Sequence, residues 1–567
     1  MPFDRTPPSE ADIRRLFVDV PKPPPQSFEL ALVLGGTVSA GAYTAGAVDF
    51  LIEALDCFEQ AKADGAAPRH DLVLKFITGT SGGGVNAAIA ARALAYDYPH
   101  IIRGPADRPA QTGNPFYDTW VNELNLSGFL ETGDIGKTLG SALNGAPIDR
   151  AATGIVNFTA PLRPRNWVAA PLGVIVTVTN LRGIPYRTDL GGGLGQIYVD
   201  HADHARFAVT YPHQPPSPPR PDAWELGFSA PATDAGAWDL FSQYARATAA
   251  FPVGFPTRTL TRPTSHYHWR VGMVPTPDGQ GLIPAARRPC WEAMVPEGQD
   301  DVPESVAFLT VDGGATNNEP IELARTALAG VGGVNPRGGL EANRAVFLID
   351  PFAGSAPLGP DAFSGLSEAL GGLVTAMIQQ TRYSTADLML AENERVFSRF
   401  MLTPQRALPN GHTAIGAKAL ASAGLGAFIG FACREFMRHD YLLGRSNCQD
   451  YLRRMFSLPR ANPVFDGWTE AQKDAHQIPG TDEVPLVPLF GTAAVAVQTD
   501  TWPRDCLDPT TFRGAIMRRY RAIVNLEVGG STLADLLGWT GALATQERVA
   551  DAVIDRMRQA LREAELD

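Results

Sequence analysis

Residues 72–91 read LVLKFITGTSGGGVNAAIAA, an apolar run followed by a glycine-rich turn and an alanine-rich stretch. The segment Leu72–Thr78 predicts a strand, and Val85–Tyr96 predicts a helix. Between them, Gly79–Gly83 fits the pattern G-x-S-x-G, in which glycines allow a sharp turn that presents a serine where the helix begins. Ser81 is therefore a candidate nucleophile. The simpler alternative is a tight turn in which this serine only caps the helix.

A second glycine turn follows another apolar run. Leu30–Leu34 predicts a strand, and the residues after it are Gly35, Gly36 and Thr37. Backbone N–H groups at such a turn would suit an oxyanion. The spacing GGTVSAGAYTAG does not place its glycines as G-x-G-x-x-G, and no acidic residue ends a clear second strand about 20 residues on, so dinucleotide binding is disfavoured.

Asp312 follows a third apolar run, Ser305–Val311, and precedes two glycines that let the backbone approach another loop closely. Taken alone, Asp-Gly-Gly usually marks a turn. The carboxylate could also act as the base that accepts the proton of a serine hydroxyl. A solvated aspartate with a pKa of ~3.9 is a weak base, so this role requires Asp312 to be partly desolvated.

The strand-like runs alternate with helical stretches along much of the chain. Further strands are predicted at Val174–Thr179 and Ala345–Ile349. Runs nearly continuous in Val, Ile and Leu are typical of strands that are covered on both faces. Their alternation with helices indicates an α/β fold, in which a mostly parallel central sheet is flanked by helices.

Three regions differ in character. Residues 1–27 are polar and proline-rich, and they predict a flexible N-terminal arm. Residues 28–352 hold the strand-like runs and glycine turns of an α/β catalytic domain, with long insertions at 97–170, 211–221 and 262–304. Residues 353–567 predict a mainly helical C-terminal region, with helices within 361–400, 413–456 and 547–566.

Composition and charge exclude several classes of function. The 48 Lys and Arg residues against 60 Asp and Glu give a net charge of -12, which opposes non-specific binding of nucleic acid. Five scattered cysteines without a CxxC pair predict free thiols in a reducing compartment, rather than a disulfide scaffold or a structural zinc site. The uncharged stretch Leu30–Val48 has the length of a membrane span, but its glycines favour a strand, a loop and a buried helix.

Four segments together resemble the patatin-like phospholipases. They are LALVLGGTVSAGAYTAG (30–46), FITGTSGG (76–83), ARATAAFPVGFP (245–256) and TVDGGATNNEPIELA (310–324). The likeness covers roughly residues 28–352. A further segment, RHDYLLGRSNCQDYL (438–452), resembles the C-terminal region of some larger bacterial relatives, and a packed helical extension is favoured for it because no chemistry can be assigned.

The resemblance implies a three-layer α/β/α fold and a lipid acyl hydrolase of the phospholipase A, lipase or esterase type. It implies that Ser81 and Asp312 form the catalytic dyad, and that the reaction requires neither a cofactor nor a metal. The oxyanion hole would be formed by Gly35, Gly36 and Thr37, and the nucleophile elbow would rest on Gly79 and Gly83. The expected partner is a lipid or membrane-surface substrate, met by a cytoplasmic protein with peripheral membrane contact, while the oligomeric state is left open.

The first glycine loop departs from the family pattern. Many relatives have three glycines and then a basic residue, whereas Thr37 takes the place of the third glycine here and Ala40 precedes Gly41. The departure affects how strongly the loop would stabilise an oxyanion, and whether the site would prefer a substrate with a phosphate headgroup. It also motivates a non-catalytic alternative, in which the protein binds lipid or serves as a scaffold while retaining the fold.

Histidines leave two further alternatives open. A Ser-His-Asp hydrolase would draw its third member from His412, His439 or His476, none of which has a persuasive loop context. The segment Asp200–His204 offers four metal-ligating side chains within five residues, but a solvated turn is favoured over a metal site.

Overall fold

The computed structural model of the chain describes most of its residues. They are 9–17, 23–102, 111–136, 139–188, 195–215, 220–228, 231–267, 270–276, 278–279, 281–296, 301–330, 334–352, 376, 379–382, 396–528 and 532–567.

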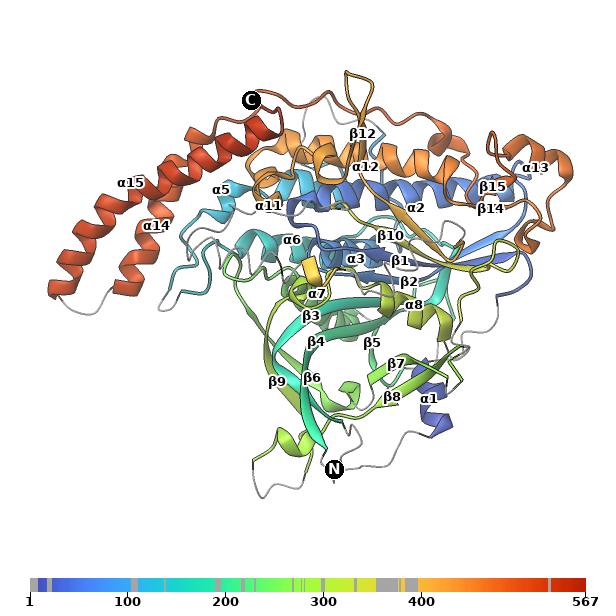
Figure 1. Cartoon of the computed structure of the whole chain (residues 1–567), viewed down its shortest axis with the longest axis horizontal. Coiled ribbons are helices and arrows are strands. Elements are labelled where there is room, and N and C mark those ends of the chain that lie inside the picture. The colour runs from blue at the N-terminus through green and yellow to red at the C-terminus, as the bar shows by residue number, and fades with distance from the viewer. Residues whose placement is uncertain are drawn as a thin grey trace.

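A nine-stranded mixed sheet forms the centre of the molecule, with β9 beside β3 and β6 beside β9 off the main strand order β11-β10-β1-β2-β3-β4-β5 (Figure 1). The strands are β1 (Ser27–Leu34), β2 (Asp71–Gly79), β3 (Val168–Thr188), β4 (Gln196–Val209), β5 (Ala223–Leu226), β6 (Arg258–Pro263), β9 (Ser305–Asp312), β10 (Arg344–Ile349) and β11 (Arg399–Leu402). From β11 to β3 every neighbouring pair is parallel, whereas β4 and β9 pair antiparallel with β3.

Helices cover both faces of this sheet. One face carries α2 (Gly41–Ala63), α3 (Gly82–Ala93) and α7 (Pro231–Thr248), which share a single large core with the strands. Apolar side chains of α8 (Ile321–Ala329) pack against the opposite face. The long helix α12 (Arg434–Arg454) lies against α2 and adds an outer layer (Figure 1). The predicted α/β fold, with helices on both faces of a mostly parallel sheet, is confirmed.

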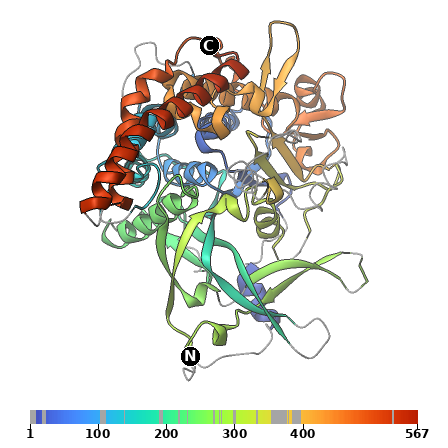
Figure 2. The same cartoon turned by 60° about the vertical axis from the view of Figure 1, so that its left-hand side comes forward.

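Smaller elements complete the architecture. The helices are α1 (Glu10–Phe17), α4 (Pro115–Tyr117), α5 (Leu126–Phe129), α6 (Ala146–Asn157), α11 (Gly424–Ala427), α13 (Glu470–His476), α14 (Arg513–Val528) and α15 (Thr532–Glu563), with the 3-10 turns η1 (Val38–Ala40) and η8 (Ile429–Ala432) and the π-helical turn η2 (Asp118–Glu123). The remaining strands form two hairpins, β7 (Arg270–Pro275) with β8 (Leu282–Arg287) and β12 (Gln405–Ala407) with β13 (Thr413–Ile415), and one antiparallel pair, β14 (Ser457–Pro459) with β15 (Glu483–Pro485), whose connection contains α13. Figure 2 shows α14 and α15 side by side at one edge of the molecule, and the β7–β8 ribbon projecting well away from them.

Several local predictions were wrong. Residues 10–17 of the expected flexible arm form α1, and the expected loop 262–304 contains the β7–β8 hairpin. The expected helix over 413–456 is continuous only in α12. Its first half is broken into β13 and short turns, because Gly416 and Gly426 adopt left-handed φ angles of 61° and 62° that a regular helix does not contain. Most of the helix expected within 361–400 falls outside the described residues.

The C-terminal region is tied to the core through close contact of α2 and α12. A Cβ atom at Gly46 would collide with the Tyr441 carbonyl, and one at Gly444 would collide with the Tyr43 carbonyl, so the two glycines permit the approach. The membrane-length segment Val38–Ala63 includes this contact, and 94% of its most apolar window is buried inside the protein. Burial of that kind is the behaviour of a core helix.

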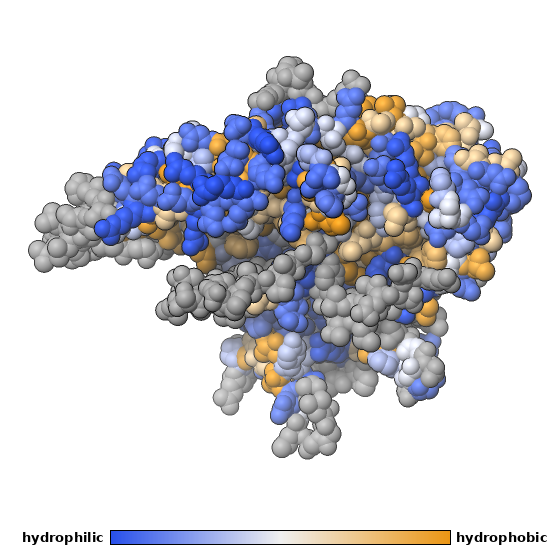
Figure 3. All heavy atoms as spheres, turned by 45° about the horizontal axis from the view of Figure 1, so that its top comes forward, coloured by the Kyte–Doolittle hydropathy of each residue, from blue (hydrophilic) through white to orange (hydrophobic). Residues whose placement is uncertain are grey.

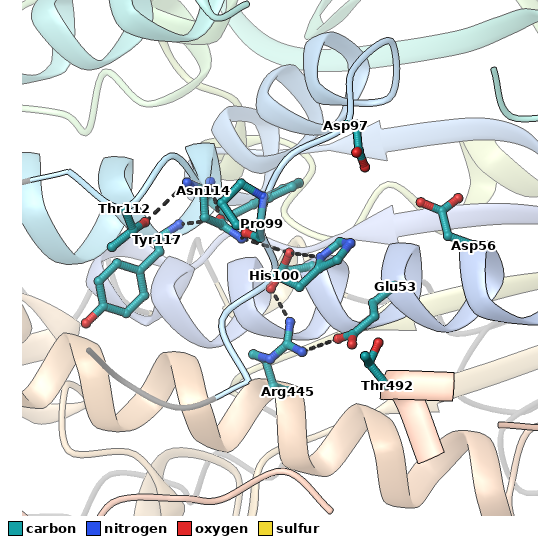
Figure 4. A network of polar contacts seen from close by, with 12 residues as sticks. Glu53, Asp56, Asp97, Pro99, His100, Thr112, Asn114, Tyr117, Arg445 and Thr492 are labelled. Carbon is teal, nitrogen blue, oxygen red and sulfur yellow. Dashed lines mark hydrogen bonds and ion pairs between the residues drawn. The ribbon is translucent and has the colours of Figure 1, made fainter. Parts of the chain in front are cut away.

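A buried polar network reinforces the same contact (Figure 4). Arg445 of α12 forms ion pairs with Asp49 and Glu53 of α2. The Asp49 carboxylate also accepts hydrogen bonds from the Tyr441 hydroxyl at 2.9 Å and from the Asn114 amide at 3.0 Å. Although burial alone would raise the pKa of Asp49, the Arg445 charge holds it below its ordinary value. The segment 438–452, which had no assigned chemistry, therefore packs α12 against α2 and supplies the arginine that pairs with the buried carboxylates of α2.

Candidate active site

Ser81 lies in the sharp turn between β2 and α3. Its backbone has φ 54° and ψ -128°, a conformation that is rare for a residue with a side chain and costs free energy unless the surroundings fix it. Its N–H donates to the Thr248 hydroxyl at 2.8 Å, which holds the turn from α7. A Cβ at Gly79 would lie 2.6 Å from the Gly83 carbonyl oxygen, and a Cβ at Gly83 would collide with the Leu34 carbonyl. Both glycines are thus sterically required, as the turn pattern predicted.

The carboxylate of Asp312 meets the Ser81 hydroxyl. Ser81 Oγ donates to Asp312 Oδ2 at 2.6 Å, and the Gly314 N–H donates to Oδ1 at 2.7 Å. The aspartate arrives from the end of β9, which pairs with β3 so that Asp312 lies opposite Val178. Both side chains of the pair are buried, with 8% of Ser81 and 4% of Asp312 exposed. Residues 231 positions apart are thus within direct hydrogen-bond reach.

Burial sets the electrostatics of this pair. It raises the pKa of Asp312 to about 6, against the lowering effect of the hydrogen bonds from Ser81 and Gly314. A carboxylate whose pKa approaches neutrality accepts a proton more readily than a solvated one, and it is still mostly ionised at neutral pH. The desolvation that a base at this position requires is therefore present.

The first glycine loop differs in detail from the expectation. The Gly35 N–H donates to the Ile349 carbonyl at 3.3 Å and the Gly36 N–H donates to the Asn318 carbonyl at 3.1 Å, so both donors are already bonded within the protein. Within the described chain, the N–H groups of Thr37 and Val38 have no such acceptor. Both residues line the cavity that contains Ser81 and Asp312, so of the three expected positions only Thr37 offers an available N–H in the described chain, and Val38 adds a second donor.

Thr37 fits the loop because of the residue that follows Ser81. A Cβ at Gly82 would collide with the Thr37 hydroxyl, so this side chain occupies the space that the glycine leaves free. Val38 adopts φ 47°, which is rare for a β-branched residue. The substitution of a threonine for the family's third glycine is accommodated without disrupting the turn.

Two cavities meet at Ser81, and Val38 and Phe251 also line both. The larger one has a volume of about 440 Å³, and its polar lining includes Asp312, Asn318, Gln379 and Arg382. The smaller one has a volume of about 50 Å³, and apart from Ser81 and Gly82 it is lined by apolar residues: Val38, Val85, Trp120, Leu124, Phe129, Ile148, Ala151, Ala152, Ile155, Ala245, Ala249, Phe251, Phe255 and Phe431.

No histidine of the described chain lines either cavity. His439 is buried against Asp440 at 2.8 Å and against the ring of Trp502, and His476 packs beside Trp468. His412 lies in an exposed turn, where its N–H donates to Asn410. The structure therefore brings none of the three candidate histidines to the Ser81–Asp312 pair.

The segment Asp200–His204 belongs to strand β4, so the expectation of a solvated turn was wrong. Asp203 is buried, and it forms ion pairs with Arg262 at 3.0 Å and with Arg270 at 2.5 Å. Although burial raises the pKa of Asp203, the Arg270 charge lowers it below the ordinary value. Among the described residues, no group of three or more His, Cys, Asp or Glu side chains is placed to hold a metal ion.

Sequence reasoning missed several residues of this site. Thr248 lies within the quoted segment 245–256, but nothing in its local pattern indicates a bond to the Ser81 N–H. No sequence pattern points to Val38 either, because its position in the site matters only through which neighbouring N–H groups are already hydrogen-bonded. The residues of the C-terminal region that line the cavities are Gln379, Arg382, Ala417, Ala423, Gly426 and Phe431.

Comparisons with known proteins identify the family of this chain. A family model described as patatin-like phospholipase matches residues 32–325, more than half of the chain. The uncharacterized protein y4iI of Sinorhizobium fredii (strain NBRC 101917 / NGR234) is 33% identical over 537 residues, which cover 87% of this chain and 74% of y4iI. The crystal structure of VipD from Legionella pneumophila aligns over 96% of this chain and 92% of that one, at 11% identity and a TM-score of 0.18, a score that supports no structural conclusion. The extent of the family match shows that this chain belongs to the patatin-like phospholipase family.

Proposed function

We propose that this protein is a serine hydrolase of lipid esters that works through a Ser81–Asp312 dyad and an acyl-enzyme on Ser81. Family membership supports a lipid acyl hydrolase in general terms. The observation that carries the finer assignment is the 2.6 Å hydrogen bond from the Ser81 hydroxyl to a buried carboxylate whose pKa is about 6.

The first half-reaction follows from the positions of these groups. Asp312 Oδ2 accepts the hydroxyl proton while Ser81 Oγ attacks the ester carbonyl carbon. The oxyanion that forms is held by the free N–H groups of Thr37 and Val38, and one such donor contributes about 3 kcal/mol to transition-state binding. The tetrahedral intermediate then expels the alcohol, which takes the proton from Asp312, and leaves the acyl group on Ser81.

The second half-reaction reverses these roles with water. Asp312 removes a proton from a water molecule, which attacks the acyl-enzyme carbonyl and releases the carboxylic acid. The proton returns from Asp312 to Ser81 Oγ. One carboxylate serves both steps, and no histidine takes part.

Two substitutions test the dyad. Ser81→Ala and Asp312→Asn should each remove hydrolysis of a short-chain nitrophenyl ester, while circular dichroism and melting temperature stay close to the parent protein. Ser127→Ala and Asp239→Asn, the same chemical changes at exposed residues outside both cavities, should leave turnover unchanged. Undiminished turnover in Asp312→Asn would defeat the dyad.

Covalent labelling separates the remaining alternatives. A fluorophosphonate should label the parent protein at Ser81, and peptide mass spectrometry should locate the adduct there. Lack of both labelling and ester hydrolysis would favour a lipid-binding or scaffold protein. Loss of turnover on replacing His412, His439 or His476 by alanine, with the fold intact, would favour a triad.

We further propose that the substrate is presented by a lipid surface. Two segments that line the larger cavity, at Pro252 and at Gly426, are adjacent to apolar side chains that face solvent. Val253 is 82% exposed and Leu425 is 38% exposed, and both have left-handed φ angles, 66° and 55°. Exposed apolar groups beside a site for apolar ligands are suited to contact with the acyl layer of a membrane.

A further inference from the structure

Residues far beyond the matched family segment build part of the site. The family match ends at residue 325, yet Ala417, Ala423 and Gly426 line the larger cavity and Phe431 lines the smaller one. We define residues 417–431 as the hood segment. It contains the short turns α11 and η8, and within α11 Leu425 at φ 55° and ψ 43° and Gly426 at φ 62° and ψ 35° depart from helical geometry.

Buried hydrogen bonds fix the hood segment in place. The two oxygens of the Asp440 carboxylate on α12 accept the N–H groups of Ala421 and Ser422, each at 2.9 Å. The hydroxyl of Ser39, next to the Thr37–Val38 turn, donates to the Ala427 carbonyl. Because α12 is itself held on α2 by Arg445, the hood segment forms a rigid wall and not a loose cover.

The two cavities differ in what they can hold. The smaller cavity presents no charged side chain, and its volume of about 50 Å³ suits one narrow apolar group. The larger cavity, of about 440 Å³, is also lined mainly by apolar surface, but it contains the charged side chains of Asp312 and Arg382, the latter paired with Glu319 and Asp350. Because the smaller cavity contains no charged group, an acyl chain can enter it without removing water from a charge, whereas the larger cavity can also accept the polar alcohol portion of an ester.

Aromatic rings close one wall of the smaller cavity. Phe431 packs edge-on against Phe129 with ring centroids 5.0 Å apart, and Phe129 packs against Phe255 at 4.9 Å. The three rings come from α5, from the loop after α7 and from the hood segment. Only Phe431 among them lies outside the matched family segment.

We infer that the smaller cavity is the acyl-chain site and that Phe431, supplied by the hood segment, limits the length of acyl chain that this protein accepts. The inference rests on the proposed function, because it describes how the same site selects its substrate. Removal of the Phe431 ring enlarges the cavity, so it should favour longer chains. Each additional methylene that finds apolar contact favours the bound state by about fourfold.

The test measures kcat/KM for the nitrophenyl esters of octanoate and butanoate, and it uses the ratio of the octanoate value to the butanoate value. Phe431→Ala should raise this ratio about tenfold or more. Ala152→Leu, which adds bulk to the lining of the same cavity, should lower it about tenfold. Phe428→Ala is the matched control, since Phe428 is half-buried in the hood segment 6.2 Å from Phe431 but lines neither cavity. Its ratio should stay at the parent value.

The outcomes distinguish this inference from the proposed function. If the parent protein hydrolyses no ester, the proposed function fails first. If it is active but Phe431→Ala and Ala152→Leu both keep the parental ratio, or if Phe428→Ala shifts it as much as Phe431→Ala, the acyl-chain assignment is overturned. If the alanine variant does not fold, Phe431→Leu replaces it. The inference then requires this variant to raise the octanoate-to-butanoate ratio about threefold or more.

Discussion

At the scale of single residues, the proposed chemistry depends on one carboxyl group that is kept out of water. Asp312 accepts hydrogen bonds from Ser81 and Gly314 while its surroundings exclude solvent. The competition between these two influences leaves its pKa at about 6. Two predictions follow from the protonation of this group.

The first prediction concerns the pH dependence of catalysis. Only the ionised carboxylate can take the Ser81 proton, so kcat/KM should be highest above the pKa of Asp312 and should fall about tenfold per pH unit well below it, with the midpoint near 6. Initial rates across this range provide the measurement.

Glu319 provides the control for this profile. It is also buried near the glycine loop, and burial raises its pKa to about 8. Glu319→Gln should therefore keep the rise near pH 6 that belongs to Asp312. Disappearance of that rise in Glu319→Gln would reassign it to Glu319.

The second prediction concerns the pH dependence of stability. The pKa of Asp312 is raised from its ordinary 3.8 to about 6, so the folded protein holds a proton that the unfolded chain has lost between these values. The free energy of unfolding should then decrease as pH rises through this window, by roughly 3 kcal/mol for this group. Asp312→Asn cannot ionise and lacks this decrease.

Urea unfolding of the parent protein and of Asp312→Asn measures this effect. The stability of the asparagine variant relative to the parent should be greater at about pH 8 than at about pH 4.5. Groups common to both proteins cancel in the comparison. An equal difference at both pH values would show that Asp312 is not desolvated in the folded state.

At the scale of elements, the contact of α2 with α12 holds the C-terminal region on the catalytic core. Arg445 forms ion pairs with both Asp49 and Glu53 at a place where all three side chains are buried. Removal of one partner from a buried ion pair leaves uncompensated charge, which is far more costly than removal of an exposed partner. The same helix supplies Asp440, which positions the hood segment.

The third prediction follows from this ion pair. Arg445→Ala should lower the free energy of unfolding by about 3–5 kcal/mol. Arg513→Ala, which breaks the half-exposed pair with Asp551, should cost at most about 1 kcal/mol. Denaturant titrations of both variants give the comparison, and equal costs would contradict the structural role of Arg445.

At the scale of the whole molecule, the proposed function requires the protein to take a lipid ester from a membrane surface. Its net charge of -12 opposes attraction to an anionic membrane, so contact should depend on apolar groups instead. On the face shown in Figure 3, apolar side chains gather over the central body, whereas the described part of the α14–α15 pair is mainly hydrophilic. We propose membrane contact at Val253 and Leu425, which are exposed beside residues that line the larger cavity, and not along that helix pair.

The fourth prediction tests this surface with the inactive Ser81→Ala protein. Val253→Asp and Leu425→Asp should each reduce co-sedimentation with zwitterionic phosphatidylcholine vesicles about fivefold or more, since a charge must then enter the apolar layer. Met455→Asp and Val495→Asp are the controls, because these side chains are also exposed, at 61% and 53%, but line neither cavity. Equal losses in all four variants would remove the proposed contact.

Local pattern and family resemblance were sufficient to predict the α/β frame, and they singled out Ser81 and Asp312, which the structure brings within hydrogen-bond reach. The apolar runs at β1, β2, β9 and β10 predicted strands, and the glycine spacing predicted the turn at Ser81. Strand β4 was not predicted, because the buried Asp203 and the half-buried His204 read as polar turn residues, and the arginines that pair with Asp203 come from β6 and β7. Long-range ion pairs of this kind leave no local periodicity.

The sequence by itself determined the α/β frame, the strand–turn–helix at Ser81 and the residue types of the dyad, because steric limits at glycine turns and apolar periodicity act between near neighbours. Only the tertiary structure decided which N–H groups remain free for an oxyanion, how strongly Asp312 is desolvated and which distant segment closes the site. These properties depend on contacts such as that of Ser39 with Ala427, 388 positions along the chain. Hydrogen-bond occupancy and burial are set by neighbours in space, which local sequence patterns do not specify.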